Sequence, residues 1–152
     1  MLLNNKYKQI LLHILKYTDE IAETLVRFGN DKEDFDNDKV FRNAVSMPML
    51  QIGELAKELK DDFRQEYPEV RVRGLVGMRN MFAHQYHNMD IDEIWSTATI
   101  DIPLIASVIK KILVDNNIDT EKDSVEETWR NKRGRMSLWI ARGLEVGTIG
   151  WY

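Results

Sequence analysis

The 152-residue sequence predicts an all-α fold: an antiparallel four-helix bundle with kinked helices, followed by an irregular or short-helical C-terminal extension. Two observations support this prediction. Apolar residues recur at three- and four-residue steps over long stretches, which is the spacing of one buried face of a helix. Short segments rich in Gly, Pro, Asn and Asp separate these stretches, and amphipathic helices with short connections pack as antiparallel bundles. We expect the bundle to span residues 1–121 and the extension to span 122–152.

The first helix is predicted from residue 7 onward and ends at Gly29-Asn30, a common stop signal. Its apolar face is formed by Tyr7, Ile10, Leu11, Ile14, Tyr17, Ile21, Leu25 and Phe28. The next stretch, 31–39, carries five acidic residues and a lone aromatic residue, Phe35. We therefore expect 31–39 to be an exposed acidic connection.

A long second helix should follow and end at Tyr67-Pro68, because the residue before a proline is disfavoured in helical geometry. Its apolar face contains Ile52, Leu55, Ala56, Leu59 and Phe63. Pro48 lies inside this span, and a proline in a helix interior removes one backbone donor. Either the helix is kinked at Pro48 or it begins there.

The rest of the sequence up to about residue 117 predicts a third and a fourth helix. The alternation over 70–73 would fit a strand, but it is too short to outweigh a lead-in to a third helix, expected from Leu75 to His84 or Tyr86. Asp90 and Glu93 form a capping-box pattern for the fourth helix, which should end near residues 116–117. Its buried face contains Ile91, Ile94, Trp95, Ala98, Ile102, Ile105, Ile109 and Ile112. Pro103 predicts a second bend.

Composition narrows the possible functions. The chain has no cysteine and three scattered histidines, so a disulfide framework, a thiolate zinc site and a histidine-rich metal centre are not expected. No apolar run is long enough to span a membrane, and we expect a cytoplasmic protein. The net charge is −4, but residues 128–152 carry five basic residues against one acidic residue, so 1–127 carries 16 basic and 24 acidic residues, or −8. Any RNA contact must therefore be local.

The segment 79–86 carries the candidate chemistry: Arg79, Asn80, His84 and Tyr86. Each helical residue advances by 100°, so Asn80 and His84 share a side, whereas Arg79 and His84 differ by about 140°. Arg79 and His84 can meet only if the helix unwinds near His84, or if a second chain completes the site. Arg79 and Tyr86 are seven residues apart, so a continued helix would place the phenol over the arginine side.

These residue types suit metal-independent RNA cleavage. An arginine binds phosphate in two-pronged fashion and stabilises the charge of a pentacoordinate transition state. An imidazole that titrates near neutrality can move the 2′-hydroxyl or leaving-group proton. Asn80 would support them by orienting the imidazole or donating to a phosphate oxygen, or it would simply cap a turn. The spacing of one arginine and one histidine is by itself common.

Several motifs in order resemble the HepT-like branch of the HEPN superfamily over about residues 7–114. They are Gln51 to Lys57, Tyr67-Pro68, Gly77 to Asn80, His84, Tyr86, Asp90, Ile94, Trp95 and Asp101 to Leu104. The resemblance implies a HEPN-type bundle that forms a homodimer, in which the segments containing Arg79 and His84 of both chains meet in a cleft and cut RNA without a metal. It implies no cofactor.

The resemblance also implies a partner. Such proteins are ribonuclease toxins of type II toxin–antitoxin pairs, with a cognate minimal nucleotidyltransferase as antitoxin. Tyr86 is then the expected acceptor of transferred adenylate. Two features depart from the pattern: Gln85 replaces a small residue, and the segment after about Asp123 has no counterpart. The alternative function is a non-catalytic HEPN module that binds a nucleotide or a partner protein, and a purely structural dimer is a third possibility.

Overall fold

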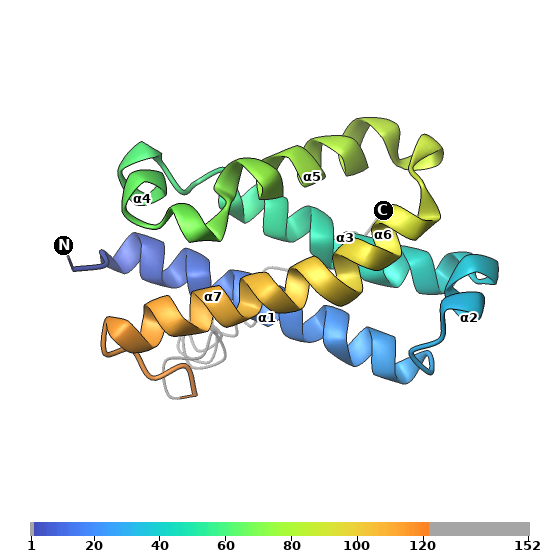
Figure 1. Cartoon of the computed structure of the whole chain (residues 1–152), viewed down its shortest axis with the longest axis horizontal. Coiled ribbons are helices and arrows are strands. Elements are labelled where there is room, and N and C mark those ends of the chain that lie inside the picture. The colour runs from blue at the N-terminus through green and yellow to red at the C-terminus, as the bar shows by residue number, and fades with distance from the viewer. Residues whose placement is uncertain (1, 122–152) are drawn as a thin grey trace, which may run out of the picture.

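The computed structural model describes residues 2–121, which fold as a bundle of long helices without a strand. Its long helices are α1 (Asn5–Arg27), α3 (Lys39–Ala56), α5 (Val72–Gln85) and α7 (Ile102–Asp115). Successive long helices run in opposite directions, and α3 lies between α1 and α5 (Figure 1). Helix α7 packs against α1. The predicted all-α class is confirmed. The predicted extension, 122–152, lies outside the described residues.

The core is formed by the apolar stripes that the sequence pattern indicates, supplemented by aromatic residues. Its largest fully buried side chains are Phe35, Phe41, Phe63, Leu11, Ile14, Ile21, Met49, Ile52, Leu59, Ile102, Ile109 and Leu113. Asn4 caps the N-terminus of α1, and its side chain accepts a hydrogen bond from the Tyr7 amide at 2.8 Å. Gly29, with φ of 86°, and Asn30, with φ of 53°, reverse the chain after α1, as the stop signal predicts.

The acidic stretch 31–39 is largely exposed, as expected, but Lys32–Asn37 forms a short helix, α2, and Phe35 is buried. Phe35 is completely buried, and its ring centroid lies 5.0 Å from those of Phe41 and Trp95. Asp31 caps the helix by accepting from the Asp34 amide at 3.1 Å. One aromatic side chain that reaches the core is enough to hold an otherwise polar segment against the bundle.

The predicted second helix is divided. Helix α3 ends at Ala56, and a separate helix, α4 (Asp61–Glu66), follows after four residues that turn the chain. Leu59 lies in this turn with its side chain completely buried, while Phe63 is buried from α4. Both side chains reach the core because the backbone changes direction between them. Pro48 lies within α3, so the alternative that the helix begins there is excluded.

The later elements follow the prediction more closely. The segment 70–73 is not a strand: a 3₁₀ turn, η1 (Pro68–Val70), leads into α5. A second 3₁₀ turn, η2 (Tyr86–Asn88), precedes α6 (Ile91–Ser96), which Asp90 caps by accepting from the Asp92 amide at 2.9 Å. A π-helical segment, η3 (Thr97–Asp101), joins α6 to α7 directly before Pro103. Pro103 lies in the first turn of α7, and the bend expected there stays a prediction.

Among residues 2–121, none of the helices combines the length and the apolar character that a membrane crossing requires.

Candidate active site on helix α5

Helix α5 is positioned by a very close approach to α3 at Gly53. A Cβ atom built on Gly53 would lie 2.2 Å from the Cβ of Arg79 and 2.8 Å from the carbonyl oxygen of Leu75. Real Cβ atoms do not tolerate such distances, so only glycine fits between the two helices. This contact sets the register of the helix pair and brings the residue after Gly53, Glu54, beside Arg79.

Arg79 is held by a carboxylate from α3. Its Nε donates to Oε1 of Glu54, and its Nη1 donates to Oδ1 of Asn80 at 3.1 Å. Lys57 adds a second positive charge, with its Nζ 3.7 Å from Oε2 of Glu54. The hydrogen bond from Arg79 holds the pKa of Glu54 below its usual value.

This arrangement leaves Arg79 oriented but not enclosed. Its side chain is 25% exposed, and within residues 2–121 no group engages its Nη2. A guanidinium has five N–H donors, so it can bind Glu54 through Nε and still present donors to an incoming phosphate.

His84 is exposed on the same helix but points elsewhere. Helix α5 continues without a break from Val72 to Gln85, so unwinding between Arg79 and His84 does not occur. The two side chains therefore remain about 140° apart around the helix axis, and one chain does not bring them together. Asn80 is exposed and contacts Arg79 rather than His84.

Helix α5 does not continue through Tyr86, so the condition under which the phenol would lie over the side of Arg79 is not met. Gln85 has φ of −130° and ψ of 16°, which ends the α-helical geometry, and Tyr86 begins η2. The Tyr86 hydroxyl donates to Oδ1 of Asn43 on α3, and its ring lies 6.1 Å from that of Phe82. The phenol is thus fastened to α3 while remaining half-buried.

Sequence reasoning did not assign roles to Gly53, Glu54 or Asn43. Asn43 and Glu54 are eleven residues apart in α3, and eleven helical steps return to within about 20° of the starting direction. The two polar residues therefore share the face of α3 that lies along α5. The eleven-residue spacing could have shown from the sequence that Asn43 and Glu54 share one face of α3. Only the crossing of α3 and α5 at Gly53 shows which residues of α5 these two side chains contact.

The site contains no evident metal centre. In the described part of the chain, no three His, Asp or Glu side chains gather in a way that could hold a metal ion.

The architecture is that of an all-α helical bundle with a polar cluster on α5. A family model described as "Ribonuclease HepT-like" matches residues 14–112, which include α3, α5 and the whole cluster. The chain belongs to this HepT-like ribonuclease family. Its family supports ribonuclease activity for this chain.

Curated relatives of the chain also carry ribonuclease names. A "Putative RNase" of Methanocaldococcus jannaschii is 36% identical over 110 residues, which cover 71% of this chain and 91% of the relative. A "Probable ribonuclease HepT" of Thermococcus cleftensis is 34% identical over 101 residues, covering 63% and 92% of the two chains. No solved structure matches the chain.

Proposed function

We propose that this protein is a metal-independent endoribonuclease toxin that acts as a homodimer. The observation that carries the proposal is that Arg79 and His84 lie on different sides of α5. Arg79 is oriented by Glu54 toward one side of the helix, and His84 is exposed on another. A second copy of α5 can supply the histidine that the first cannot direct at its own arginine.

The chemistry needs only these groups. The Arg79 guanidinium binds the scissile phosphate and stabilises the pentacoordinate transition state. One His84 imidazole accepts the proton of the ribose 2′-hydroxyl as its oxygen attacks phosphorus. The bond from phosphorus to the 5′-oxygen breaks, and the protonated His84 of the other copy donates a proton to that oxygen. The products are a 2′,3′-cyclic phosphate and a free 5′-hydroxyl.

The face of α3 beside the site supports an interface there. Met47 lies on the same stripe of α3 as Asn43 and Glu54, seven residues before Glu54, and is 58% exposed. A second chain that covered this face would bury an apolar side chain and approach Arg79 from outside.

Cleavage in the presence of EDTA tests the activity. Purified protein should cleave RNA, and His84→Ala should lower the rate by about 10²- to 10⁴-fold, the usual contribution of a general acid–base residue. His87→Ala is the matched control, because His87 is an exposed histidine in the adjacent turn. Undiminished cleavage by His84→Ala would end the proposal.

A mixture of two inactive variants tests the shared site. Arg79→Ala chains retain His84, and His84→Ala chains retain Arg79, so a mixed dimer contains one Arg79 and one His84 that face each other across the interface, with water in place of the second imidazole as the proton donor. Mixing them should give more cleavage than either variant alone, because neither homodimer contains both an Arg79 and a His84. If the mixture is as inactive as its components, the two residues do not act across a dimer.

The proposed regulation acts on Tyr86. A cognate nucleotidyltransferase antitoxin would join the Tyr86 oxygen to the α-phosphorus of ATP, with loss of the phenolic proton and release of pyrophosphate. The adenylate would place negative charge and bulk in the cleft that the two copies of α5 are proposed to form. Mass spectrometry should find one AMP on the peptide containing Tyr86 and none in Tyr86→Phe, and the modified protein should stop cleaving RNA.

The second candidate is a module that binds a nucleotide or partner protein without cleaving RNA. The acidic balance of residues 1–127, at −8, favours it because RNA-binding surfaces are usually basic. It predicts stable binding of the nucleotidyltransferase by unmodified protein that leaves RNA intact.

A further inference from the structure

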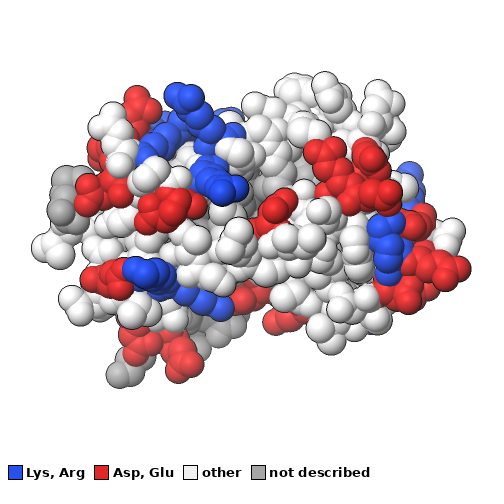
Figure 2. Space-filling model, viewed as in Figure 1, with Lys and Arg blue, Asp and Glu red and all other residues white. Residues whose placement is uncertain are grey.

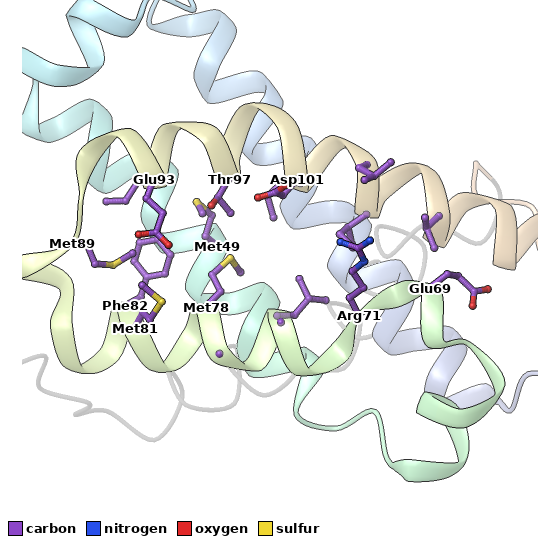
Figure 3. A pocket seen from close by; sticks show the side chains of 18 residues that line it. Met49, Glu69, Arg71, Met78, Met81, Phe82, Met89, Glu93, Thr97 and Asp101 are labelled. Carbon is purple, nitrogen blue, oxygen red and sulfur yellow. The ribbon is translucent and has the colours of Figure 1, made fainter.

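A groove of about 750 Å³ runs along the side of α5 that faces α7 (Figure 3). The backbones of α5 and α7 do not approach each other closely, although each packs against another helix of the bundle. Residues of the hydrophobic core form the bottom of the groove, and methionine side chains line its sides. The apolar residues that line it include Met49, Leu75, Met78, Met81, Phe82, Met89, Ile94, Ile102, Leu104, Ile105 and Val108.

This groove is separate from the candidate active site. Arg79, Asn80, His84 and Tyr86 do not line it. Met81 lines the groove and follows Arg79 by two residues, which places the two side chains about 160° apart around α5. Leu75 and Phe82 also line the groove, about 40° and 60° from Arg79, so the groove is centred roughly 100° around α5 from the arginine.

Charges around the groove are mostly acidic. Glu69, Glu93 and Asp101 line it, against a single basic residue, Arg71 (Figure 3). Glu93 and Asp101 form no ion pair with any other residue in 2–121. Figure 2 shows uncharged residues on this face between a group of basic residues at the upper left and groups of acidic residues at the right. Such a surface suits an apolar segment that carries basic residues.

The chain itself contains a segment of this kind outside the described residues. Residues 128–152 carry five basic residues and one acidic residue, together with apolar residues that include Trp129, Leu138, Trp139, Ile140 and Leu144. Flexible, unbranched methionine side chains adapt to bulky aromatic partners of this type. The family match ends at residue 112, so this segment is an addition to the shared domain.

The chain leaves the bundle where such a segment can reach the groove. Helix α7 ends at Asp115 beside η1, the turn that carries Glu69 at one end of the groove. The groove follows α7 for less than its full length of roughly 21 Å, at 1.5 Å per residue. Residues 122–152 can extend over roughly 100 Å, so length does not limit the contact.

We propose that residues 128–152 dock in this groove of their own chain. Their aromatic and aliphatic side chains cover the methionines of α5 and the apolar residues of α7, and basic side chains among their four arginines and one lysine pair with Glu93 and Asp101. The docked segment gives α5 a partner on the side that the bundle leaves open. The inference is independent of the ribonuclease proposal.

Photo-crosslinking of the full chain tests whether residues 128–152 occupy the groove. A benzophenone amino acid replaces Leu104, which is 55% exposed at the groove, or Val26, a control that is 76% exposed at the end of α1. Normal and heavy-isotope protein are mixed before irradiation. Position 104, and not position 26, should crosslink to peptides from 128–152 of the same chain. Crosslinks from 104 to a second copy, or none to 128–152, would overturn the proposal.

Charge reversal tests how the segment is held. Glu93→Lys with Asp101→Lys should lower the crosslink yield from position 104 by roughly fivefold, as expected for the loss of two screened surface ion pairs. Asp19→Lys with Glu23→Lys is the matched control, because it makes the same charge change at exposed positions of α1. Equal yields from the two double variants would contradict the proposed pairing.

Discussion

The two sides of helix α5 differ in how closely they are packed. On the side facing α3, the backbones of the two helices approach so closely at Gly53 that no side chain fits at this position. Beside it, Glu54 accepts a hydrogen bond from Arg79. On the side facing α7, a groove of about 750 Å³ separates the helices. Arg79 therefore belongs to the rigid side of the helix. The open side is available for binding without disturbing the arginine.

The largest expected effect is that of Gly53→Ala. The added Cβ would overlap Arg79 and Leu75, so α3 and α5 must move apart. The free energy of unfolding should therefore fall by about 3 kcal/mol. Urea denaturation measures this loss. RNA cleavage should fall as well, because Arg79 moves with α5. A variant as stable as the original protein would show that the close approach does not hold the helix pair.

Glu54→Gln should lower RNA cleavage by roughly tenfold, because a neutral amide orients the guanidinium less firmly than a carboxylate. Glu58→Gln is the control: Glu58 is an exposed glutamate just beyond α3 that pairs with Lys6 at 3.6 Å. Equal activity of both variants would remove Glu54 from the site.

The same contact predicts a pH dependence of stability. Arg79 lowers the pKa of Glu54 in the folded protein, so the ion pair contributes to stability above the ordinary value of 4.5 and is lost as the pH falls through the lowered pKa. The stability difference between the original protein and Glu54→Gln should therefore shrink below pH 4.5. A difference that is constant from neutral to acidic pH would contradict the ion pair.

Gly77→Ala probes the open side. A Cβ at Gly77 meets nothing within 4 Å, and alanine is favoured over glycine inside a helix, so the variant should gain about 0.5–1 kcal/mol of stability in urea denaturation. The opposite signs expected for Gly53→Ala and Gly77→Ala would sharpen the comparison. A loss at Gly77 as large as that at Gly53 would show that both sides are closely packed.

Tyr86→Phe should have the smallest effect on stability, about 0.5 kcal/mol, because it removes only the hydrogen bond to the exposed Asn43. Cleavage by unmodified protein should be nearly unchanged, and adenylation should be lost. Tyr17→Phe, another half-buried tyrosine, serves as the control in both assays. A large loss of cleavage in Tyr86→Phe would mean that the phenol takes part in the reaction.

The candidate site was only partly predictable. The separation of Arg79 from His84 follows from helix periodicity, and the unbroken α5 agrees with it. The partners of the site residues were not predictable in the same way. Glu54 and Asn43 meet α5 because of the crossing at Gly53, and nothing within a few residues of Arg79 or Tyr86 encodes that contact.

The sequence by itself determined the all-α class, most helix positions, the cap at Asp90, and the angular separation of Arg79 and His84. These features depend on interactions between residues three to five positions apart. Only the tertiary structure decided that Phe35 is buried in an acidic segment, that the chain turns between α3 and α4, and that α5 has one closed and one open side. These features depend on the register and spacing of helices distant in the sequence, where a single glycine sets how closely two of them approach.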